Sequence, residues 1–193
     1  MRDQLRTAAA VALVGTALLS GCSERQEASA TLPPASAAPP TSAAALPPLG
    51  PPDLPMPDEA RAQTPEGAQA FVRYYIDLIN RTSTVMDAAP LREFSDGCRD
   101  CNRIATNVEE HAALGHDYQG GQVVIGNVLA PVMGDGEASV PLYVGQTPLV
   151  VRDGSGTVLS DESSDEIPEM YAGIGLRWDD TRQTWLMQDF TVG

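Results

Sequence analysis

Two cysteines three positions apart are the sharpest chemical feature of this 193-residue chain. Cys98 and Cys101 form a C-x-x-C pattern, which is typical of structural disulfides, thiol–disulfide exchangers and metal sites. An exchanger lowers the pKa of its attacking thiol, but Asp96 and Asp100 oppose thiolate formation and only Arg99 favours it. We expect a structural disulfide that holds the start of a helix, with redox activity as the alternative.

Two histidines further along extend this pattern to four side chains of the types that zinc prefers. They give the order Cys98-x2-Cys101-x9-His111-x4-His116. If one helix runs from Cys101 to Leu114, His111 lies about 15 Å of helical rise from Cys101, too far to share an ion. We therefore predict no metal here and expect both histidines to be solvated near a helix end, where their partial charge suits the helix dipole.

Two phenols and two carboxylates are candidates for a small-ligand pocket: Tyr75, Asp77, Tyr143 and Asp189. Enzymes such as ketosteroid isomerase combine a carboxylate base with a hydroxyl donor in this way. Nothing in the spacing of the four residues fixes their geometry, and core packing is the default role for the aromatic side chains. No motif in the sequence indicates a cofactor.

Acidic residues gather later in the chain and raise the question of calcium binding: Asp153, Asp161, Glu162, Asp165, Glu166 and Glu169. The run from Asp153 to Thr157 is similar to the opening of an EF-hand loop, but Ser164 stands at the twelfth position, where that loop needs glutamate. We expect a solvated loop between strands instead.

Helical patterns come first among the elements that must position these residues. Thr64-Pro65-Glu66-Gly67 predicts an N-cap, a proline at the first helical position and an acid in the first turn. Apolar residues at three- and four-residue spacing then predict a helix that ends near Asn80. A short helix around 90–94 and a third from Cys98 to Leu114 follow, the last stopped by Gly115.

Beyond Gly120-Gly121 the period changes from helical to extended. Ranges 122–133 and 137–144 predict a hairpin over Gly134-Asp135-Gly136. Shorter extended pieces are expected at 149–152 and 157–159, and a second hairpin at 171–178 and 184–192. Helices followed by an antiparallel meander indicate an α+β fold.

The first 22 residues read as an export signal. Arg2 and Arg6 precede an apolar run that is too short to span a bilayer. The run closes on Leu19-Ser20-Gly21-Cys22, which resembles the lipobox of bacterial lipoproteins. The resemblance implies a signal peptide over 1–21 and acylation of Cys22, which would anchor the protein to the extracytoplasmic face of the cell membrane.

The next segment, 22–57, is rich in proline, alanine and serine. Such a composition cannot bury enough apolar surface to offset its ordering entropy, so we expect a disordered linker. Paired prolines favour extended polyproline II. The folded domain is therefore expected over 58–193.

Charge restricts the partners of the protein. The formal net charge is −14, and all twelve basic residues are arginines. An acidic surface repels phosphate backbones and anionic lipid headgroups, which argues against nucleic acid and against electrostatic adhesion to membranes. The lipid on Cys22 is then the only membrane attachment that the sequence offers.

The predicted domain is similar to known families. Helices packed into a strongly bent antiparallel sheet describe the NTF2-like, or SnoaL-like, cone. More narrowly, the chain resembles the DUF6318 family of actinobacterial lipoproteins from about residue 56 to 193. The matching residues are Met56-Pro57, Thr64-Pro65-Glu66-Gly67, Ala70-Phe71-Val72-Arg73-Tyr74-Tyr75, Asn80 and Cys98-Arg99-Asp100-Cys101. This resemblance implies a fold and a setting, but no activity.

Three functional hypotheses follow. The first is a non-enzymatic, lipid-anchored domain that binds an envelope protein or a small ligand. The second is an NTF2-like enzyme that acts on a small apolar molecule. The third is a thiol-redox lipoprotein that uses Cys98 and Cys101.

Overall fold

Helices precede strands throughout the part of the chain that the computed structural model describes, residues 46–193. The helical elements are η1 (Asp58–Arg61), α1 (Pro65–Val85), α2 (Ala89–Glu93) and α3 (Arg99–Ala113). The strands are β1 (Asp117–Gly120), β2 (Val123–Val128), β3 (Val132–Met133), β4 (Glu137–Gln146), β5 (Leu149–Arg152), β6 (Ile167–Asp179) and β7 (Thr184–Val192). This order confirms the α+β prediction. The predicted signal peptide, Cys22 and the linker up to residue 45 lie outside the described residues.

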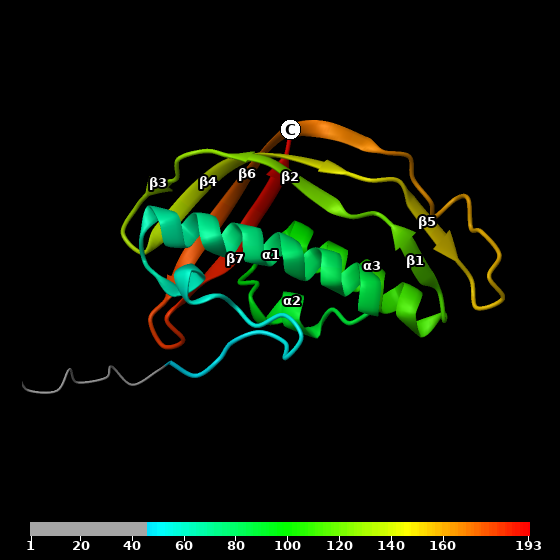
Figure 1. The fold of residues 1–193 in the computed structure, drawn as a ribbon, viewed down its shortest axis with the longest axis horizontal. Helices are drawn as coiled ribbons and strands as arrows, with labels where there is room; N and C mark the ends of the chain where they lie inside the picture. Colours follow the sequence, from blue (N-terminus) through cyan, green and yellow to red (C-terminus); the bar gives the residue numbers. More distant parts are fainter. Residues whose placement is uncertain (1–45) are drawn as a thin grey trace, which may run out of the picture. The chain divides into compact units, whose positions relative to one another are not determined.

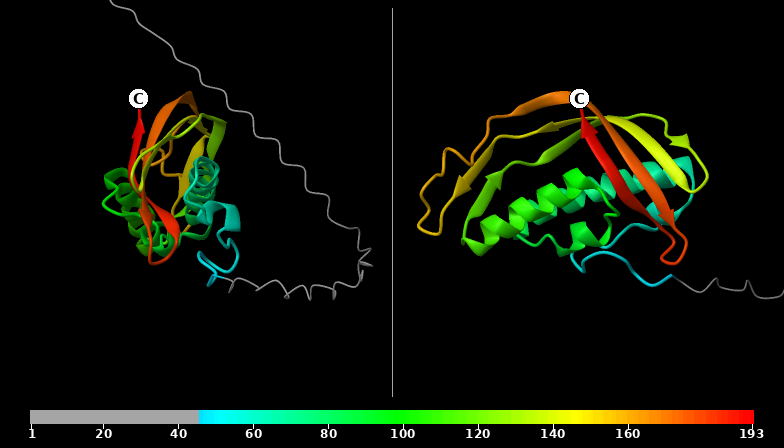
Figure 2. Two further views of the ribbon diagram at one scale, coloured as in Figure 1. Left: turned by 90° about the vertical axis from the view of Figure 1, so that its left-hand side faces the viewer. Right: turned by 180° about the vertical axis from the view of Figure 1, so that it is seen from behind.

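The main sheet is antiparallel, with strand order β2-β4-β6-β7 and β3 paired to β4. A separate two-stranded ribbon pairs β1 with β5. The main sheet arches over the helices, so that α1 and α3 lie against its concave face (Figure 1; Figure 2, right). Helices held in the concavity of a bent antiparallel sheet confirm the expected NTF2-like cone. Within residues 46–193, no helix is long and apolar enough to cross a bilayer.

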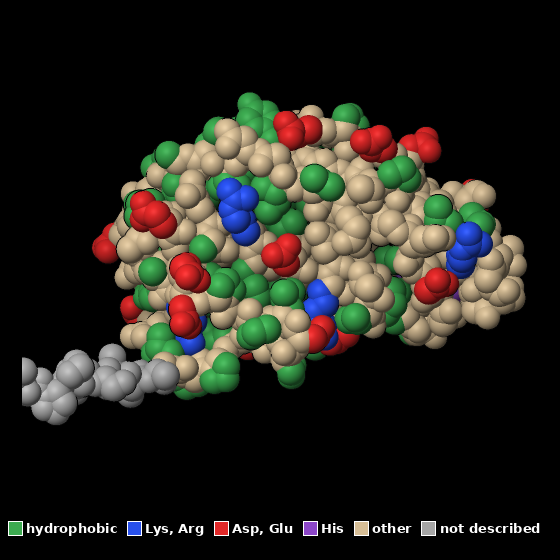
Figure 3. Space-filling view, viewed as in Figure 1, with side chains coloured by type: hydrophobic (Ala, Val, Ile, Leu, Met, Phe, Trp, Pro, Cys, Tyr) green, Lys and Arg blue, Asp and Glu red, His purple; other side chains and the backbone are tan. Residues whose placement is uncertain are grey.

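The core lies between these two layers. Side chains on alternate positions of each strand point to the helices, as the pleat requires. Those fully buried include Leu142 from β4, Ile174 and Leu176 from β6, Trp185 and Met187 from β7, and Phe71, Tyr75 and Leu78 from α1. On the outward face the strands carry more exposed residues, and acidic side chains are scattered over the visible surface with fewer basic ones among them (Figure 3).

The start of α1 follows the predicted capping pattern. Thr64 is the N-cap, and its hydroxyl accepts a hydrogen bond from the Gly67 N–H at 3.1 Å. A Cβ on residue 67 would collide with the Ala62 carbonyl oxygen, which explains the glycine. The helix does not end near Asn80 as expected. It continues to Val85 and ends with Met86 in the left-handed region at φ 56°.

Residues 46–57 correct the predicted domain boundary at 57. Met56 belongs to the buried core, and Leu49 and Leu54 pack against it. The Tyr74 hydroxyl donates to the Leu54 carbonyl at 3.3 Å, and a Cβ on residue 50 would collide with that hydroxyl, so Gly50 permits this approach. These residues form a strap against the helices. Leu49, Leu54 and Met56 lie between the prolines and supply these apolar contacts. The prediction missed them because it relied on the average composition of residues 22–57.

The strands also differ in places from the sequence-based expectation. The single strand expected over 122–133 is two strands, and Pro131, which lies in the gap between them, has no N–H for the ladder. A register shift between Ile125 and Val128 also interrupts the pairing within β2. Strand β1 was not expected. Strand β6 begins at Ile167 rather than at 171, and the piece expected at 157–159 forms only an isolated bridge between Val158 and Arg152.

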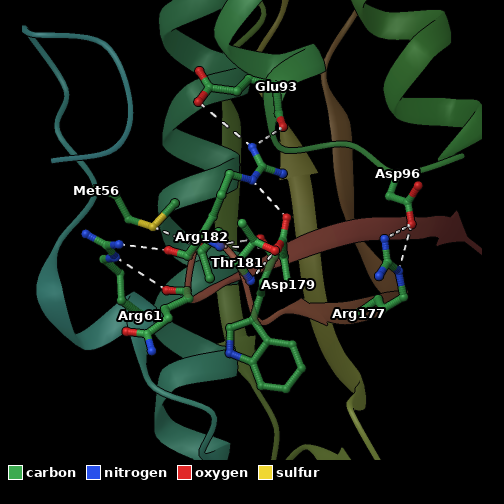
Figure 4. Close-up of polar contacts among 11 residues, drawn as sticks. Met56, Arg61, Glu93, Asp96, Arg177, Asp179, Thr181 and Arg182 are labelled. Carbon is green, nitrogen blue, oxygen red and sulfur yellow. Dashed lines mark hydrogen bonds and ion pairs between the residues drawn. The ribbon is translucent and has the colours of Figure 1, made fainter. Parts of the chain in front are cut away.

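A group of polar contacts ties the β6–β7 turn to the helices (Figure 4). We call Arg61, Glu93, Asp179 and Arg182 the turn cluster. Arg61 donates to the backbone carbonyls of Arg182 at 2.8 Å, Gln183 at 3.4 Å and Pro47 at 2.5 Å. Arg182 donates to the Asp179 carboxylate at 2.9 Å and to the Glu93 carbonyl at 3.1 Å. The cluster thereby joins the strap, η1, α2 and the last hairpin.

Candidate functional site

A groove of about 640 Å³ lies between α3 and the inner face of the main sheet. Its wall is the first half of α3, and its floor is made by strand residues from β2, β4, β6 and β7. The lining residues are Arg99, Asp100, Arg103, Ile104, Val123, Val144, Gly145, Gln146, Ile167, Met170, Phe190, Thr191 and Val192.

Strand register explains why the floor is apolar. Val144 on β4 lies opposite Met170 on β6, and both occupy inward-facing positions of the pleat. Phe190 on β7 pairs with Ile174 of the same inward set. Val144 and Phe190 are buried members of the core and Met170 is half-buried, and all three line the groove. The groove is therefore continuous with the apolar interior of the domain.

Charged side chains stand at the mouth of the groove on the first turns of α3. The Arg103 Nε lies 3.3 Å from the Asp100 carboxylate, and an Arg99 guanidinium nitrogen lies 3.7 Å from it. The two arginine side chains are 92% and 65% exposed, whereas Asp100 is only 26% exposed. One carboxylate between two guanidiniums leaves a net positive charge at the mouth.

A second hollow of about 200 Å³ adjoins the groove. The two share Ile104, Val123 and Gln146 in their linings, so they lie side by side. The second hollow extends between α1 and α3 toward the β1–β5 ribbon, where Tyr118 and Leu149 line it. Together they make an elongated space along α3 that is lined by both apolar and polar side chains.

The β2 wall of this space is fixed by a side chain of α1. The Asn80 amide donates to the Val123 carbonyl at 2.9 Å, and its oxygen accepts from the Val123 N–H at 2.7 Å. Asn80 thus takes the place of a neighbouring strand at the free edge of β2. Gln69, three turns earlier, donates to the Leu129 carbonyl at 2.9 Å. These bonds explain why Asn80 is not the end of the helix.

The four residues predicted as a pocket are not brought together. Tyr75 is fully buried in the core, where its hydroxyl lies 2.6 Å from the Ser95 hydroxyl, and burial raises its pKa. Asp77 is exposed on α1, and partial desolvation raises the pKa of its carboxyl. The other two candidates project from the opposite face of the sheet.

Those two are Tyr143 and Asp189. Tyr143 packs edge-to-face against its cross-strand neighbour Tyr171, with ring centroids 5.9 Å apart, and both rings are exposed. Asp189 is exposed and accepts a hydrogen bond from the Thr191 hydroxyl at 2.7 Å. The pocket hypothesis therefore named residues on both sides of the sheet, because periodicity alone did not show which face was concave.

The structure contains the Cys98–Cys101 disulfide. Both cysteines are fully buried, and Cys98 is the N-cap of α3, with its sulfur accepting from the Cys101 N–H at 3.2 Å. The bridge thus fixes the helical turn that carries the mouth of the groove. His111 and His116 lie near the other end of α3, with their Nδ1 atoms 3.1 Å apart.

The residues of the possible zinc and calcium patterns make local contacts in the described part of the chain. Within residues 46–193 no cluster of three or more histidine, cysteine or acidic side chains is placed to hold a metal ion. The Asp153 carboxylate accepts from the backbone N–H groups of Ser155 and Thr157, both at 2.9 Å, and from the Ser155 hydroxyl at 2.6 Å. These bonds lower the pKa of Asp153. The three hydrogen bonds end on one Asp153 carboxylate oxygen, a type of atom that binds calcium in an EF-hand loop.

The fold and this site define an NTF2-like α+β domain with an apolar groove beneath its sheet. The chain belongs to a family of unknown function, DUF6318, whose model matches residues 47–190. That match begins at the strap, in agreement with the domain boundary seen in the structure. A comparison with curated proteins finds no match.

Several solved structures are similar to this chain at low sequence identity. The intermembrane space region of the chloroplast protein ARC6 has 17% identity and a TM-score of 0.48, covering 67% of this chain and 95% of that one. Aln2 from a Streptomyces species has 14% identity and a TM-score of 0.42, covering 67% and 90%. A protein of unknown function with a cystatin-like fold from Nostoc punctiforme has 7% identity and a TM-score of 0.38, covering 63% and 86%.

Proposed function

We propose that this domain is a non-enzymatic binding module that holds a small, largely apolar ligand in the groove beside α3. The observation that carries the proposal is the groove itself, a hollow of about 640 Å³ whose floor is made of inward-facing apolar side chains. Pockets for small molecules have volumes on the order of 300–1,000 Å³ and are mostly apolar with a few polar groups. The groove falls within this range of volumes, and its lining combines apolar side chains with polar and charged ones.

The lining favours binding over catalysis. Among the described residues, Asp100 is the one carboxylate that lines the groove, and it is engaged with Arg99 and Arg103. A general base must reach the proton that it removes, and its pKa must suit that task. Tyr75, whose hydroxyl would be the natural donor, is occupied with Ser95 inside the core.

The position of the disulfide also argues against a thiol-exchange enzyme. Exchange requires that a thiolate reach one sulfur of the bridge. Both Cys98 and Cys101 are fully buried, and Asp100 next to them disfavours a thiolate. A structural role at the start of α3 is consistent with both features.

The setting is part of the proposal. We place the domain at the extracytoplasmic face of the cell membrane, held by lipid on Cys22 after removal of residues 1–21. The charged start, the short apolar run and the lipobox-like Leu19-Ser20-Gly21-Cys22 support this. Replacement of the acylated thiol, Cys22→Ala, should abolish palmitate labelling in cells and release the protein from membranes. Unchanged labelling would refute the anchor.

Ligand binding in the groove can be tested with an uncharged fluorescent dye, N-phenyl-1-naphthylamine, added to the full chain. Met170 lines the groove, and Met170→Trp should narrow it and lower the rise in dye fluorescence. The matched control is Tyr171→Trp, at the next position of β6 but on the outer face of the sheet. Weaker dye binding in Met170→Trp alone supports the proposal. Equal binding by both variants overturns it.

A further inference from the structure

We propose that the ligand of the groove is a linear anionic amphiphile, with one alkyl chain and a carboxylate or phosphate head. This inference rests on the proposed function and adds the chemical class of the ligand. The head would lie at the mouth beside Arg99 and Arg103. The chain would run along α3 over Ile104 toward the second hollow.

The partners of the arginines support the anionic head. The chain has a net charge of −14. Five of its described arginines donate two or more hydrogen bonds each: Arg61, Arg81, Arg92, Arg177 and Arg182. Arg92, for example, makes two bonds to Glu109, at 2.6 and 2.7 Å, and a third to Thr106. Arg99 and Arg103 differ, because the one ion pair of each is with the shared Asp100. Two exposed guanidiniums with one carboxylate between them are complementary to a further anionic group.

The shape of the apolar space supports a linear chain. The groove and the second hollow share Ile104, Val123 and Gln146, so the two lie next to each other along the helix, and an alkyl chain that occupied both would cross these three side chains. Arg99 at the mouth and Asn107 in the second hollow are separated by about 12 Å of helical rise. A length of this order matches an extended dodecyl group better than a compact ring system.

Substitutions of the acidic and the basic residues at the mouth should change ligand affinity in opposite directions. Asp100 competes with an incoming anion for both guanidiniums. Its neutralisation in Asp100→Asn should therefore strengthen binding of an anionic amphiphile. In contrast, Arg99→Gln combined with Arg103→Gln should weaken that binding. A surface that merely adsorbs apolar molecules would respond to neither change.

The experiment is isothermal titration calorimetry of the full chain with dodecyl phosphate, laurate, dodecanol and inorganic phosphate, each amphiphile below its critical micelle concentration. We expect dodecyl phosphate and laurate to bind at least about tenfold more tightly than dodecanol, since each charge-assisted contact contributes roughly a factor of ten. Arg99→Gln with Arg103→Gln should remove this preference, and Asp100→Asn should increase it. Arg73→Gln, an exposed arginine on α1, is the control and should match the wild type.

The outcomes separate this inference from the proposed function. Equal affinities for dodecanol and dodecyl phosphate, unaffected by the arginine variants, would overturn the anionic class while groove binding stands. Binding of inorganic phosphate as tightly as dodecyl phosphate would overturn the amphiphile. Failure of all three amphiphiles to bind would overturn the groove as a ligand site and the inference with it.

Discussion

Two regions of the domain carry arginines whose partners differ. In the turn cluster, Arg61 and Arg182 donate to backbone carbonyls and a carboxylate, so each guanidinium has several partners (Figure 4). At the groove mouth, Arg99 and Arg103 extend into solvent and share one carboxylate. The difference separates arginines that hold the fold from arginines available to a ligand. Changes in the first region should cost stability, and changes in the second should alter binding.

The largest expected effect lies beside the turn cluster at Trp185. Its fully buried indole donates to the Ala62 carbonyl at 3.0 Å and packs edge-to-face on Trp178. Trp185→Ala should lower the free energy of unfolding by about 3–5 kcal/mol, measured by urea denaturation, because it opens a large cavity. Trp178→Ala should cost clearly less, since that ring is half-exposed. Equal losses of unfolding free energy in Trp185→Ala and Trp178→Ala would contradict the assignment of Trp185 to the core.

The next effect is expected at Asn80, which fixes the β2 wall of the groove. Asn80→Ala leaves the N–H and C=O of Val123 without their partners and should cost about 1–3 kcal/mol. Asn80→Asp keeps an acceptor for the N–H but sets a carboxylate against the carbonyl. It should therefore be as unstable as Asn80→Ala at pH 7 and regain stability at acidic pH, where a protonated carboxyl donates. If Asn80→Asp were as stable as the wild type at pH 7, the hydrogen bond from Asn80 to the Val123 carbonyl would be contradicted.

A smaller effect is expected at Arg61, which holds the strap. Arg61→Ala removes three bonds to backbone carbonyls of Pro47, Arg182 and Gln183, all partly open to water. The expected cost is about 1–2 kcal/mol in the free energy of unfolding, with faster proteolysis near Pro47. Arg73→Ala should stay within about 0.5 kcal/mol of the wild type. Strap proteolysis at the wild-type rate in Arg61→Ala would show that the apolar anchors suffice.

The smallest effect is the acid dependence of the turn cluster. The Arg182 guanidinium and the turn N–H groups lower the pKa of Asp179 below its usual 3.8. A carboxyl group whose pKa is lowered by folding stabilises the fold at pH values above its usual pKa. This contribution disappears as the pH falls through the folded-state pKa. In chemical denaturation at pH 6, the free energy of unfolding of the wild type should exceed that of Asp179→Asn by less than about 1 kcal/mol. This difference should disappear as the pH falls below about 4. A gap that widened on acidification would reverse the assigned sign.

Local signals predicted much of the fold but little of the site. The cap at Thr64 and the turn at residues 134–136 follow from a few neighbouring residues, and the structure has both. Strand β1 has four residues and depends on its distant partner β5, so no local period predicts it. The end of α1 was misplaced at Asn80 because the use of that amide on Val123 is a tertiary contact.

The groove shows the same limit. Val144, Met170 and Phe190 occupy inward positions of their strands, and in sequence they look like any core residue. Whether such residues meet a helix or a hollow depends on how far α3 stands from the sheet, which is set by the curvature of the whole layer. One signal was available: Arg99 and Arg103 share a helical face in a chain with few basic residues.

Ligand binding in the groove is tested most directly by following the backbone amide shifts of the ¹⁵N-labelled full chain during titration with dodecyl phosphate. Ligand binding in the groove should give the largest shifts at Arg103, Ile104, Val144 and Met170, with little change in the turn cluster and over the outer face of the sheet. Shifts concentrated on that outer face or in the turn cluster, with the groove silent, would contradict it.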